Sequence, residues 1–300
     1  MAEISCLGEA HGRDWSIYHG DCARVVAQLP DKSVGFSIYS PPFSSLFVYS
    51  QSEADMGNSA NDAEFMQHYK FMLREKLRVT KPGRMSAVHC SDLPYTKWKD
   101  GITATRAFSD EIRRAHEEVG FHFLRRITVW RDPVVEMTRT KALNLLYKQL
   151  QKDSAKSWPG MADYVMLFRA PGDNTEHVAH ERGESSEITL DQWQKWASPV
   201  WMDIQQTNTL NVAMAREGQD ERHLCPLQLD LIERAVIMWS NPGDVVLSPF
   251  TVVGSEGFVS VKQRRKFVGV ELKDTYFKAA SRHLAQAETN AVDLFADAAD

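Results

Sequence analysis

Short apolar runs and helical spacings alternate along most of the chain. Four to eight apolar residues bounded by Gly, Pro or Asp indicate a buried strand, whereas apolar residues three and four apart indicate a helix. These patterns predict strands at 15–19, 34–39, 85–90, 121–130, 164–169, 244–247 and 266–271. They predict helices at 23–29, 62–79, 108–119, 258–262 and 273–283. Strands that alternate with helices are typical of an α/β fold.

One of these strands ends abruptly. Residues 34–43 read V-G-F-S-I-Y-S-P-P-F, and the apolar run stops at Ser40-Pro41-Pro42-Phe43. Two consecutive prolines lack ladder N–H groups and have a fixed φ, so the chain leaves the strand in a stiff turn. The turn presents a hydroxyl, free carbonyls and the Phe43 ring at the carboxyl end of a strand, where ligands bind in open α/β sheets. We therefore predict that this turn is the reaction centre.

A second strand also ends at Ser-Pro-Phe. Residues 243–257 read G-D-V-V-L-S-P-F-T-V-V-G-S-E-G, and the glycine turn at 254–257 opens a helix. The next predicted strand ends in Glu271. A glycine turn followed by an acid at the tip of the next strand is the layout of a nucleoside-binding βαβ unit, in which the acid accepts hydrogen bonds from ribose hydroxyls. An ordinary helix–strand connection is the alternative interpretation.

The composition narrows the class of protein. The chain has 300 residues, of which 43% are hydrophobic, and a net charge of −5, which argues against coating nucleic acid through bulk charge. We see neither an apolar run of the roughly 20 residues that span a bilayer nor a signal-peptide pattern. The four cysteines form no Cys-x-x-Cys pair. We therefore expect a reduced, cytoplasmic protein without a metal site.

The middle of the chain carries the opposite charge. Residues 122–170 hold nine basic and four acidic side chains, a local balance of +5. The segment is either a solvated helix face or a surface that binds phosphates. Farther along, Trp193, Trp196 and Trp201 form an aromatic cluster that is more typical of packing than of a binding site.

Together the two strand–turns resemble the amino-methylating DNA methyltransferases, enzymes that transfer a methyl group from S-adenosylmethionine (SAM) to N4 of cytosine or N6 of adenine. The family's catalytic motif, (Asp/Ser/Asn)-Pro-Pro-(Tyr/Phe/Trp), corresponds to Ser40-Pro41-Pro42-Phe43, and its SAM motif, Asp-Pro-Phe-x-Gly-x-Gly, to residues 248–254. The order of catalytic motif, basic segment and SAM motif resembles the permuted β class, and in particular its phage-borne branch. The resemblance implies a Rossmann-like α/β fold, circularly permuted, in which a mixed seven-stranded sheet has helices on both faces and a target-recognition insertion.

The resemblance also assigns roles to residues. Ser40 and the Pro41 carbonyl would accept hydrogen bonds from the amine, Pro42 would stiffen the turn, and Phe43 would stack on a flipped base. Glu271 would bind the ribose and Asp21 the adenine edge. The other implied cofactor-binding residues are His223, Pro226, Ser248, Pro249, Phe250, Gly254 and Ser255. The implied DNA-binding residues are Arg125, Arg131, Arg139, Lys141 and Lys148.

Three of these assignments have simpler alternatives, and the SAM motif departs from the family pattern. Asp21 fits a helix cap, Phe250 a core residue and His223 a surface histidine equally well. The family has an acid where this chain has Ser248 and a glycine where it has Val252. A β-branched side chain crowds a turn that wraps the cofactor, so full SAM affinity does not follow from the resemblance.

The resemblance implies double-stranded DNA as the partner of a monomer or homodimer. Serine at the first motif position favours N4 of cytosine over N6 of adenine. The alternatives are a degenerate methyltransferase fold that binds DNA but holds SAM weakly, and methylation of RNA or protein. We expect a catalytic half at 1–122, a recognition insert at 123–222, a SAM-binding half at 223–285 and a tail at 286–300. Within the catalytic half, residues 44–62 are expected to form a loop over the site.

Overall fold

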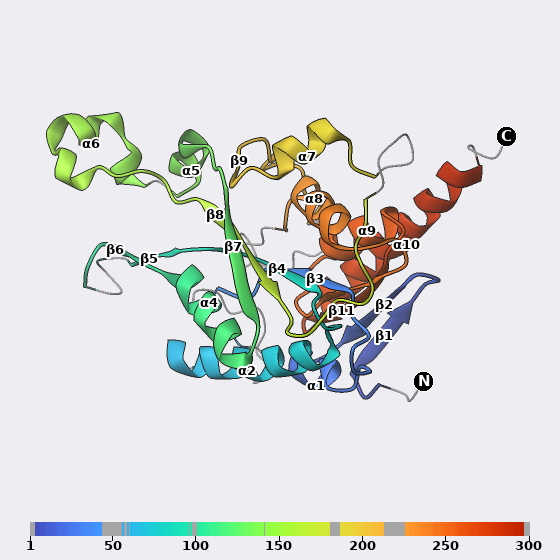
Figure 1. The fold of residues 1–300 in the computed structure, drawn as a ribbon. Coiled ribbons are helices and arrows are strands. Elements are labelled where there is room, and N and C mark those ends of the chain that lie inside the picture. Colours follow the sequence, from blue (N-terminus) through green and yellow to red (C-terminus); the bar gives the residue numbers. More distant parts are fainter. Residues whose placement is uncertain are drawn as a thin grey trace.

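A mixed β-sheet forms the centre of the molecule (Figure 1). The computed structural model describes residues 4–43, 56, 59, 61–95, 97, 101–140, 142–180, 187–212 and 226–296, so the predicted loop at 44–62 lies almost wholly outside them. The strand order among these residues is β1-β2-β11-β10-β3-β4-β8-β7-β9. The strands are β1 (Gly8–His11), β2 (Trp15–His19), β3 (Phe36–Tyr39), β4 (Met85–Ser91), β7 (His122–Val129), β8 (Asp163–Arg169), β9 (Val200–Trp201), β10 (Val245–Ser248) and β11 (Lys266–Glu271). A separate small hairpin pairs β5 (Leu93–Tyr95) with β6 (Ala104–Arg106).

All seven predicted strands are present, but the expected strand number of seven is wrong, because β1 and β9 bring the sheet to nine strands within the described residues. β1 reads G-E-A-H and alternates half-buried with exposed residues, so it lacks an apolar run. β9 has two residues and pairs with the end of β7. Both strands lie at the edges of the sheet, where pairing with one neighbour suffices and hydrophobic patterning is weak.

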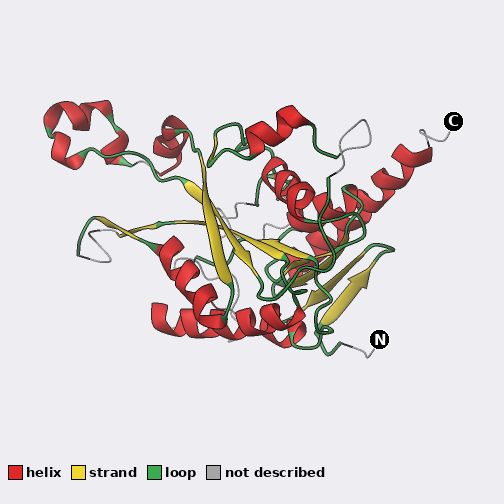
Figure 2. Cartoon of the chain, viewed as in Figure 1, coloured by secondary structure: helices red, strands yellow, loops and turns green. Residues whose placement is uncertain are grey.

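Helices cover both faces of the sheet (Figure 2). One face packs against α1 (Cys22–Val26), α2 (Asp62–Val79) and α4 (Phe108–Val119), and the other against α8 (Leu229–Trp239), α9 (Ser255–Lys262) and α10 (Asp274–Ala296). The predictions for α2 and α4 have the observed bounds, and Gly120 ends α4 in the left-handed conformation, with φ of 117°. The helix predicted at 273–283 is too short, because α10 continues to Ala296 and buries Leu284 and Ala287.

The direction of the chain changes at the centre of the sheet. β2, β11, β10, β3 and β4 are parallel, and Leu247 of β10 lies opposite Ser37 of β3. From β10 the chain passes through α9 to β11 on one side, and from β3 through α2 to β4 on the other. Such a switch point opens a crevice at the carboxyl ends of the two strands, where α/β proteins bind their ligands.

Antiparallel strands carry the expected recognition insert. β8 pairs with β4 and β7 in the main sheet, so the insert boundary expected at 123 falls within the sheet. The chain between β7 and β8 contains α5 (Pro133–Thr140), η3 (Leu143–Leu145), α6 (Tyr147–Lys152) and η4 (Ser154–Lys156). We call residues 130–162 the lobe, because in Figure 1 they project away from the sheet at the upper left.

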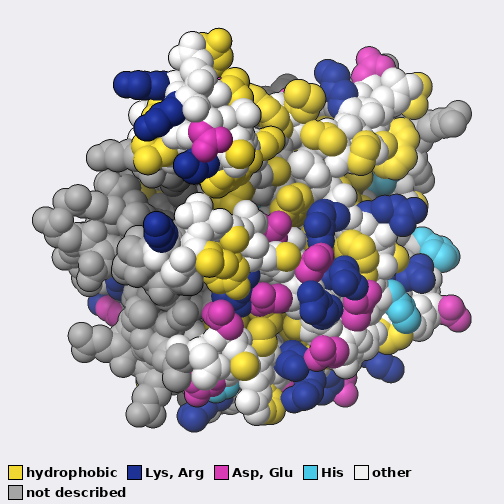
Figure 3. Space-filling view, turned by 90° about the vertical axis from the view of Figure 1, so that its left-hand side faces the viewer, with side chains coloured by type: hydrophobic (Ala, Val, Ile, Leu, Met, Phe, Trp, Pro, Cys, Tyr) yellow, Lys and Arg dark blue, Asp and Glu magenta, His cyan; other side chains and the backbone are white. Residues whose placement is uncertain are grey.

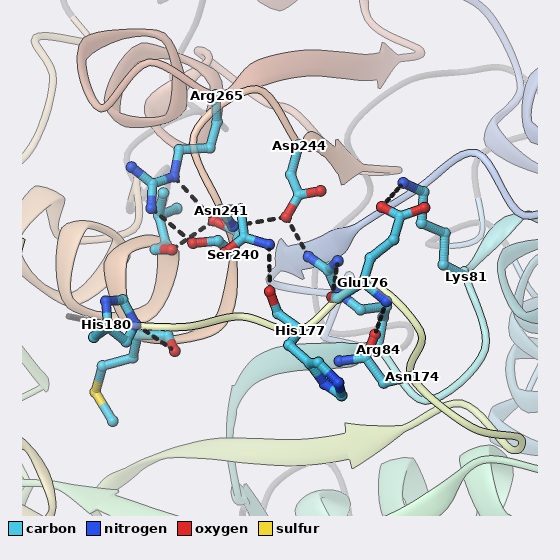
Figure 4. Close-up of polar contacts among 12 residues, drawn as sticks. Lys81, Arg84, Asn174, Glu176, His177, His180, Ser240, Asn241, Asp244 and Arg265 are labelled. Carbon is cyan, nitrogen blue, oxygen red and sulfur yellow. Dashed lines mark hydrogen bonds and ion pairs between the residues drawn. The ribbon is translucent and has the colours of Figure 1, made fainter.

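The amino edge of the sheet is tied together by polar contacts (Figure 4). Arg84, just before β4, forms an ion pair with Asp244, just before β10, and both side chains are buried. Residues 171–180 cross this edge, where Asn241 Nδ2 donates to the His177 carbonyl at 2.9 Å. These contacts hold the β4 side and the β10 side of the sheet together at the end opposite the crevice.

Among the described residues, every helix is too short or too polar to cross a bilayer.

A buried lysine supports the end of β3. Lys76 of α2 is fully buried, and its Nζ lies 2.8 Å from Tyr39 Oη, 2.8 Å from Ser86 Oγ and 3.2 Å from His116 Nε2. Burial lowers the pKa of Lys76 well below its ordinary value. Since Tyr39 is the residue before Ser40, this cluster fixes the strand from which the Pro-Pro turn begins.

The Lys76→Met variant tests this buried amine. The unfolded lysine binds a proton that the folded one holds less tightly, so the wild-type free energy of unfolding should rise between pH 7 and 9 relative to that of the variant. The difference in free energy of unfolding between wild type and variant can grow by at most about 1.4 kcal/mol per pH unit. Urea titrations at several pH values measure it. Lys70→Met, on the same helix but in a surface pair with Glu118, should show no such trend, and equal pH slopes for wild type and Lys76→Met would contradict the account.

Candidate active site

The residues predicted to form the site lie along one edge of the sheet. Asp21 follows β2, Ser40 follows β3, and Ser248 and Glu271 end β10 and β11. The strands that carry them are parallel and adjacent, so their carboxyl ends meet. The Gly20 N–H donates to the Glu271 carbonyl at 2.9 Å, which places the start of α1 beside the end of β11.

The Pro-Pro turn is held from both sides. Ser40 is half-buried, Pro41 is buried, and Ser40 Oγ lies 2.9 Å from Nδ1 of His89, near the carboxyl end of β4. The Phe43 ring is half-buried and lies 6.3 Å from the Phe108 ring of α4, between centroids, with a tilt of 51°. The turn thus presents a partly exposed hydroxyl and a partly exposed aromatic ring at the crevice.

Behind Ser40 lies a group of polar side chains, two of which, His89 and Asp163, were not predicted from the sequence. His89 Nε2 is 3.5 Å from Asp163 Oδ2 at the start of β8, and Asp163 Oδ1 accepts from Arg131 Nη1 at 3.0 Å. Burial would raise the pKa of Asp163, but the contacts from His89 and Arg131 outweigh it and hold that pKa below its ordinary value. The one available signal was a histidine near the end of an otherwise apolar strand, M-S-A-V-H-C.

The second strand–turn wraps back toward Glu271. Val252 has φ of 50° and Gly254 φ of 90°, so both lie in the left-handed region. The Val252 N–H donates to Glu271 Oε2 at 2.7 Å, and the Lys273 N–H donates to Oε1 at 2.9 Å. A Cβ added at Gly254 would lie 3.1 Å from Ala280 Cα, so the turn packs closely on α10. The valine therefore occupies a backbone conformation suited to glycine, as the departure from the family motif predicts.

Two hydroxyls at this turn are buried without a hydrogen-bond partner among the described residues. They belong to Ser248, which is fully buried at the end of β10, and to Ser255, which begins α9. A buried polar group left unpaired costs about 1–3 kcal/mol. A polar ligand in the crevice would satisfy them, and the Glu271 carboxylate one strand away suits the hydroxyls of a ribose. These residues therefore fit a nucleoside cofactor.

A buried acid lies in the first turn of α9. Burial, reinforced by the negative charge of Glu271, raises the pKa of Glu256 to about 8. At neutral pH Glu256 is therefore mostly protonated, which leaves Glu271 as the main negative charge at this turn. A cationic ligand would meet one carboxylate here rather than two.

Asp21 and Phe250 also have the structural roles that were their alternatives. Asp21 Oδ1 accepts from the Ala23 N–H at 2.8 Å and caps α1. The Phe250 ring lies 5.7 Å from the Tyr39 ring and 6.5 Å from the Tyr69 ring, between centroids, so it packs on the core while remaining half-buried. Pro249 is buried beside it.

The remaining predicted residues lie in different surroundings. Pro226 is half-buried just before α8, whereas His223 lies outside the described residues. Arg125 on β7 and Lys148 on α6 are exposed, while Arg131 is paired with Asp163 at the base of the lobe. The structure does not describe Lys141 or the side chain of Arg139. Of the tryptophans, Trp201 is buried, and the Arg234 guanidinium lies over the rings of Trp196 and Trp201.

Replacing Val252 by glycine should stabilise the protein. A left-handed conformation costs an L-residue about 1–2 kcal/mol, and the added chain entropy of glycine offsets about 0.5–1 kcal/mol of the gain. We expect Val252→Gly to raise the free energy of unfolding by up to about 1 kcal/mol, measured by urea denaturation. Val252→Ala keeps a Cβ and should gain less than half as much. A Val252→Gly variant no more stable than wild type would show that the turn is unstrained.

Comparison with known proteins agrees with this geometry. A family model described as DNA methylase, N6_N4_Mtase, matches residues 34–282. The chain is 32% identical over 314 residues to the type II methyltransferase M.Cfr9I of Citrobacter freundii, covering 94% of this chain and 91% of that protein. It is 25% identical over 268 residues to M.BamHI of Bacillus amyloliquefaciens, covering 85% of this chain but only 54% of that relative's length.

A solved structure shows the same fold. The Thermus thermophilus protein TTHA0409, in complex with S-adenosyl-L-methionine, superposes with a TM-score of 0.66 and 22% identity, covering 91% of this chain and 95% of that one. The family match extends from the strand before the Pro-Pro turn to α10, so it includes both strand–turns and the lobe. The chain belongs to the DNA methylase family of N6- and N4-amino-methyltransferases.

Proposed function

We propose that this protein transfers a methyl group from SAM to the exocyclic amine of a flipped DNA base, with N4 of cytosine preferred. One observation carries the proposal. The Pro-Pro turn and the turn at 248–254 leave neighbouring parallel strands at the same edge of the sheet, with Leu247 opposite Ser37. A cofactor held by one turn therefore lies beside a base held by the other.

Ser40 and Pro41 supply what the amine requires. The lone pair of such an amine is delocalised into the ring, so acceptors for its N–H groups favour the nucleophilic form and stabilise the charge that develops. Ser40 Oγ and the Pro41 carbonyl serve as these acceptors, and the Pro-Pro turn fixes them before the substrate arrives. Phe43 stacks on the base, a contact worth about 1–3 kcal/mol.

SAM would be held by residues of β10, β11 and the turn between β10 and α9. Glu271 would accept from the ribose hydroxyls, and Gly254 would let the backbone approach. The Ser248 and Ser255 hydroxyls, which have no partner among the described residues, would gain one. When bound, SAM supplies an electrophilic methyl group on a sulfonium. The SAM complex of TTHA0409, which has the same fold, supports this choice of cofactor.

We propose that the lobe contacts duplex DNA. It joins β7 to β8 at the same edge of the sheet as Ser40, and η3, α6 and η4, all of whose residues are described, contain no buried side chain. Leu143 and Tyr147 are exposed beside Lys148, and Figure 3 shows this end of the molecule, with Lys and Arg side chains beside hydrophobic ones. Helices without a core of their own and with basic side chains suit a polyanionic partner. Arg125, which is exposed on β7, would add to the basic side chains at this end of the sheet, and DNA contacts by Arg139 and Lys141 stay a prediction from the sequence.

A second candidate is a DNA-binding protein that has lost most of its SAM affinity. The left-handed Val252 and the loss of the acid at Ser248 favour it. The Val252 N–H also already occupies Glu271 Oε2, an oxygen that the ribose would use. The proposal requires that Glu271 Oε2 accepts a second hydrogen bond beside that from Val252, or that the Val252 contact breaks when SAM binds.

Nucleoside mass spectrometry distinguishes these possibilities. Unmodified plasmid and phage DNA is incubated with the protein and SAM and then digested to nucleosides. We expect N4-methylcytosine, because Ser40 rather than an acid begins the catalytic motif. N6-methyladenine without N4-methylcytosine would show that the preferred base is wrong. If neither methylated nucleoside appears, although the protein binds both DNA and SAM, the result contradicts the proposed activity on these DNAs.

A further inference from the structure

Side chains from three strands form a polar line behind the catalytic turn. Ser40 Oγ lies 2.9 Å from His89 Nδ1, and His89 Nε2 lies 3.5 Å from Asp163 Oδ2. The other oxygen of Asp163 accepts from Arg131. We propose that His89 takes up, through Ser40, the proton that the base amine releases, and that Asp163 orients His89 for this step. The proposal rests on the proposed function and adds a catalytic group to it.

The partners of His89 determine which of its nitrogens carries hydrogen. Asp163 is a buried carboxylate paired with the Arg131 guanidinium, so it is ionised and favours a hydrogen on the nearby Nε2. Nδ1 then has only a lone pair, and the contact at 2.9 Å must be the Ser40 hydroxyl donating to Nδ1. The distance of 3.5 Å to Asp163 is long for a hydrogen bond, as catalytic contacts often are before the substrate binds.

This arrangement defines what Ser40 offers the substrate. Because its hydrogen points to His89, both lone pairs of Ser40 Oγ remain available to accept from the amine N–H. The groups are those of the Ser-His-Asp hydrolases, but there serine faces Nε2 and the acid faces Nδ1. Here the histidine ring is used in the opposite sense, and serine is a relay rather than a nucleophile.

The transfer then balances. The lone pair of the amine nitrogen forms the new N–C bond while the bond from the methyl carbon to sulfur breaks. The electron pair of the broken bond stays on sulfur, which becomes a neutral thioether. The nitrogen, now positively charged, gives one proton to Ser40 Oγ as the Ser40 hydroxyl proton moves to His89 Nδ1. The imidazolium is stabilised by the Asp163 carboxylate and later loses its proton to water.

The other ionisable groups near His89 face elsewhere. Its chain neighbour Cys90 is buried in the opposite core, with α1, α2 and α4. Asp92 accepts from the N–H and the hydroxyl of Ser109 at the start of α4. Among the described residues, Asp163 is therefore the charged group in contact with His89, and Arg131 is the charged group that holds Asp163. A change of protonation at His89 would therefore act mainly on the charged groups of this line, Asp163 and Arg131.

The test is the single-turnover rate of methyl transfer, with enzyme in excess over duplex DNA, measured across pH for wild type and His89→Asn. Asparagine keeps an acceptor near the Nδ1 position but cannot take up a proton. General-base catalysis typically contributes at least about 100-fold. We expect His89→Asn to lose about that factor at neutral pH, with unchanged Kd values for SAM and DNA. We also expect wild type to lose activity on acidification in a one-proton step that the variant lacks.

Each alternative result overturns the proposal. A His89→Asn rate equal to that of wild type would mean that His89 takes no part. A reduced rate with the wild-type pH dependence would mean that His89 only positions Ser40. His11→Asn, an exposed histidine on β1 that pairs with Glu9, is the matched control and should leave both rate and pH dependence unchanged.

Nitrogen-15 NMR of the histidines tests the arrangement even without turnover. The signal lost in His89→Asn identifies His89, and we expect it to show hydrogen on Nε2 and a lone pair on Nδ1 in wild type. Asp163→Asn should shift that balance toward hydrogen on Nδ1. A wild-type signal with hydrogen on Nδ1 would overturn the proposal. A wild type that has the expected signal but makes no methylated base would instead count against the proposed function.

Discussion

The parallel pairing of β3 with β10 is the constraint on which the site depends. It joins segments that are far apart in the sequence and brings the carboxyl ends of the two strands, which lead to Ser40 and to Ser248, to the same edge of the sheet. At the opposite edge, the buried ion pair of Arg84 with Asp244 links the strands on either side of β3. A buried ion pair adds little net stability, because both charges lose their hydration. Any register that separated the two side chains would leave a buried charge without its partner, so the pair favours the observed register.

The chemistry at Ser40 follows from its surroundings. Direct transfer from a sulfonium needs acceptors for the amine hydrogens more than it needs a strong acid or a metal. A serine hydroxyl carries no charge, and its oxygen lies 2.9 Å from His89 Nδ1. In the proposed arrangement its hydrogen points to His89, which leaves the oxygen as an acceptor for the amine. Since Arg131 lies at the base of the lobe and Asp163 begins β8, the same polar line joins the proposed DNA-binding surface to the reaction centre.

The sequence predicted what local patterns specify. Apolar runs and helical spacing identified the seven central strands and the bounds of α2 and α4, because burial on one face sets those periods. Edge strands β1 and β9 were missed, since neither has an apolar run. The helix predicted to end at residue 283 continues to Ala296, and Leu284 and Ala287 keep its apolar face in contact with the core.

The site was predicted in part for a related reason. Ser40 and Glu271 stand in recognisable strand–turn patterns, so their place at the carboxyl edge could be inferred. His89 and Asp163 come from different strands, and only the pairing of β4 with β8 brings them together. Val252 was predicted only in part. Its departure from the glycine of the motif was visible in the sequence, whereas its hydrogen bond to Glu271 was not.

The central claim is that the turn at 248–254 holds SAM beside Ser40. Calorimetric titration of SAM into wild type and Glu271→Ala tests it most directly. We expect one site with a micromolar Kd in wild type, and a Kd at least tenfold weaker, about 1.4 kcal/mol, in the variant. Absence of binding to wild type, or equal Kd values for the two proteins, would contradict the account.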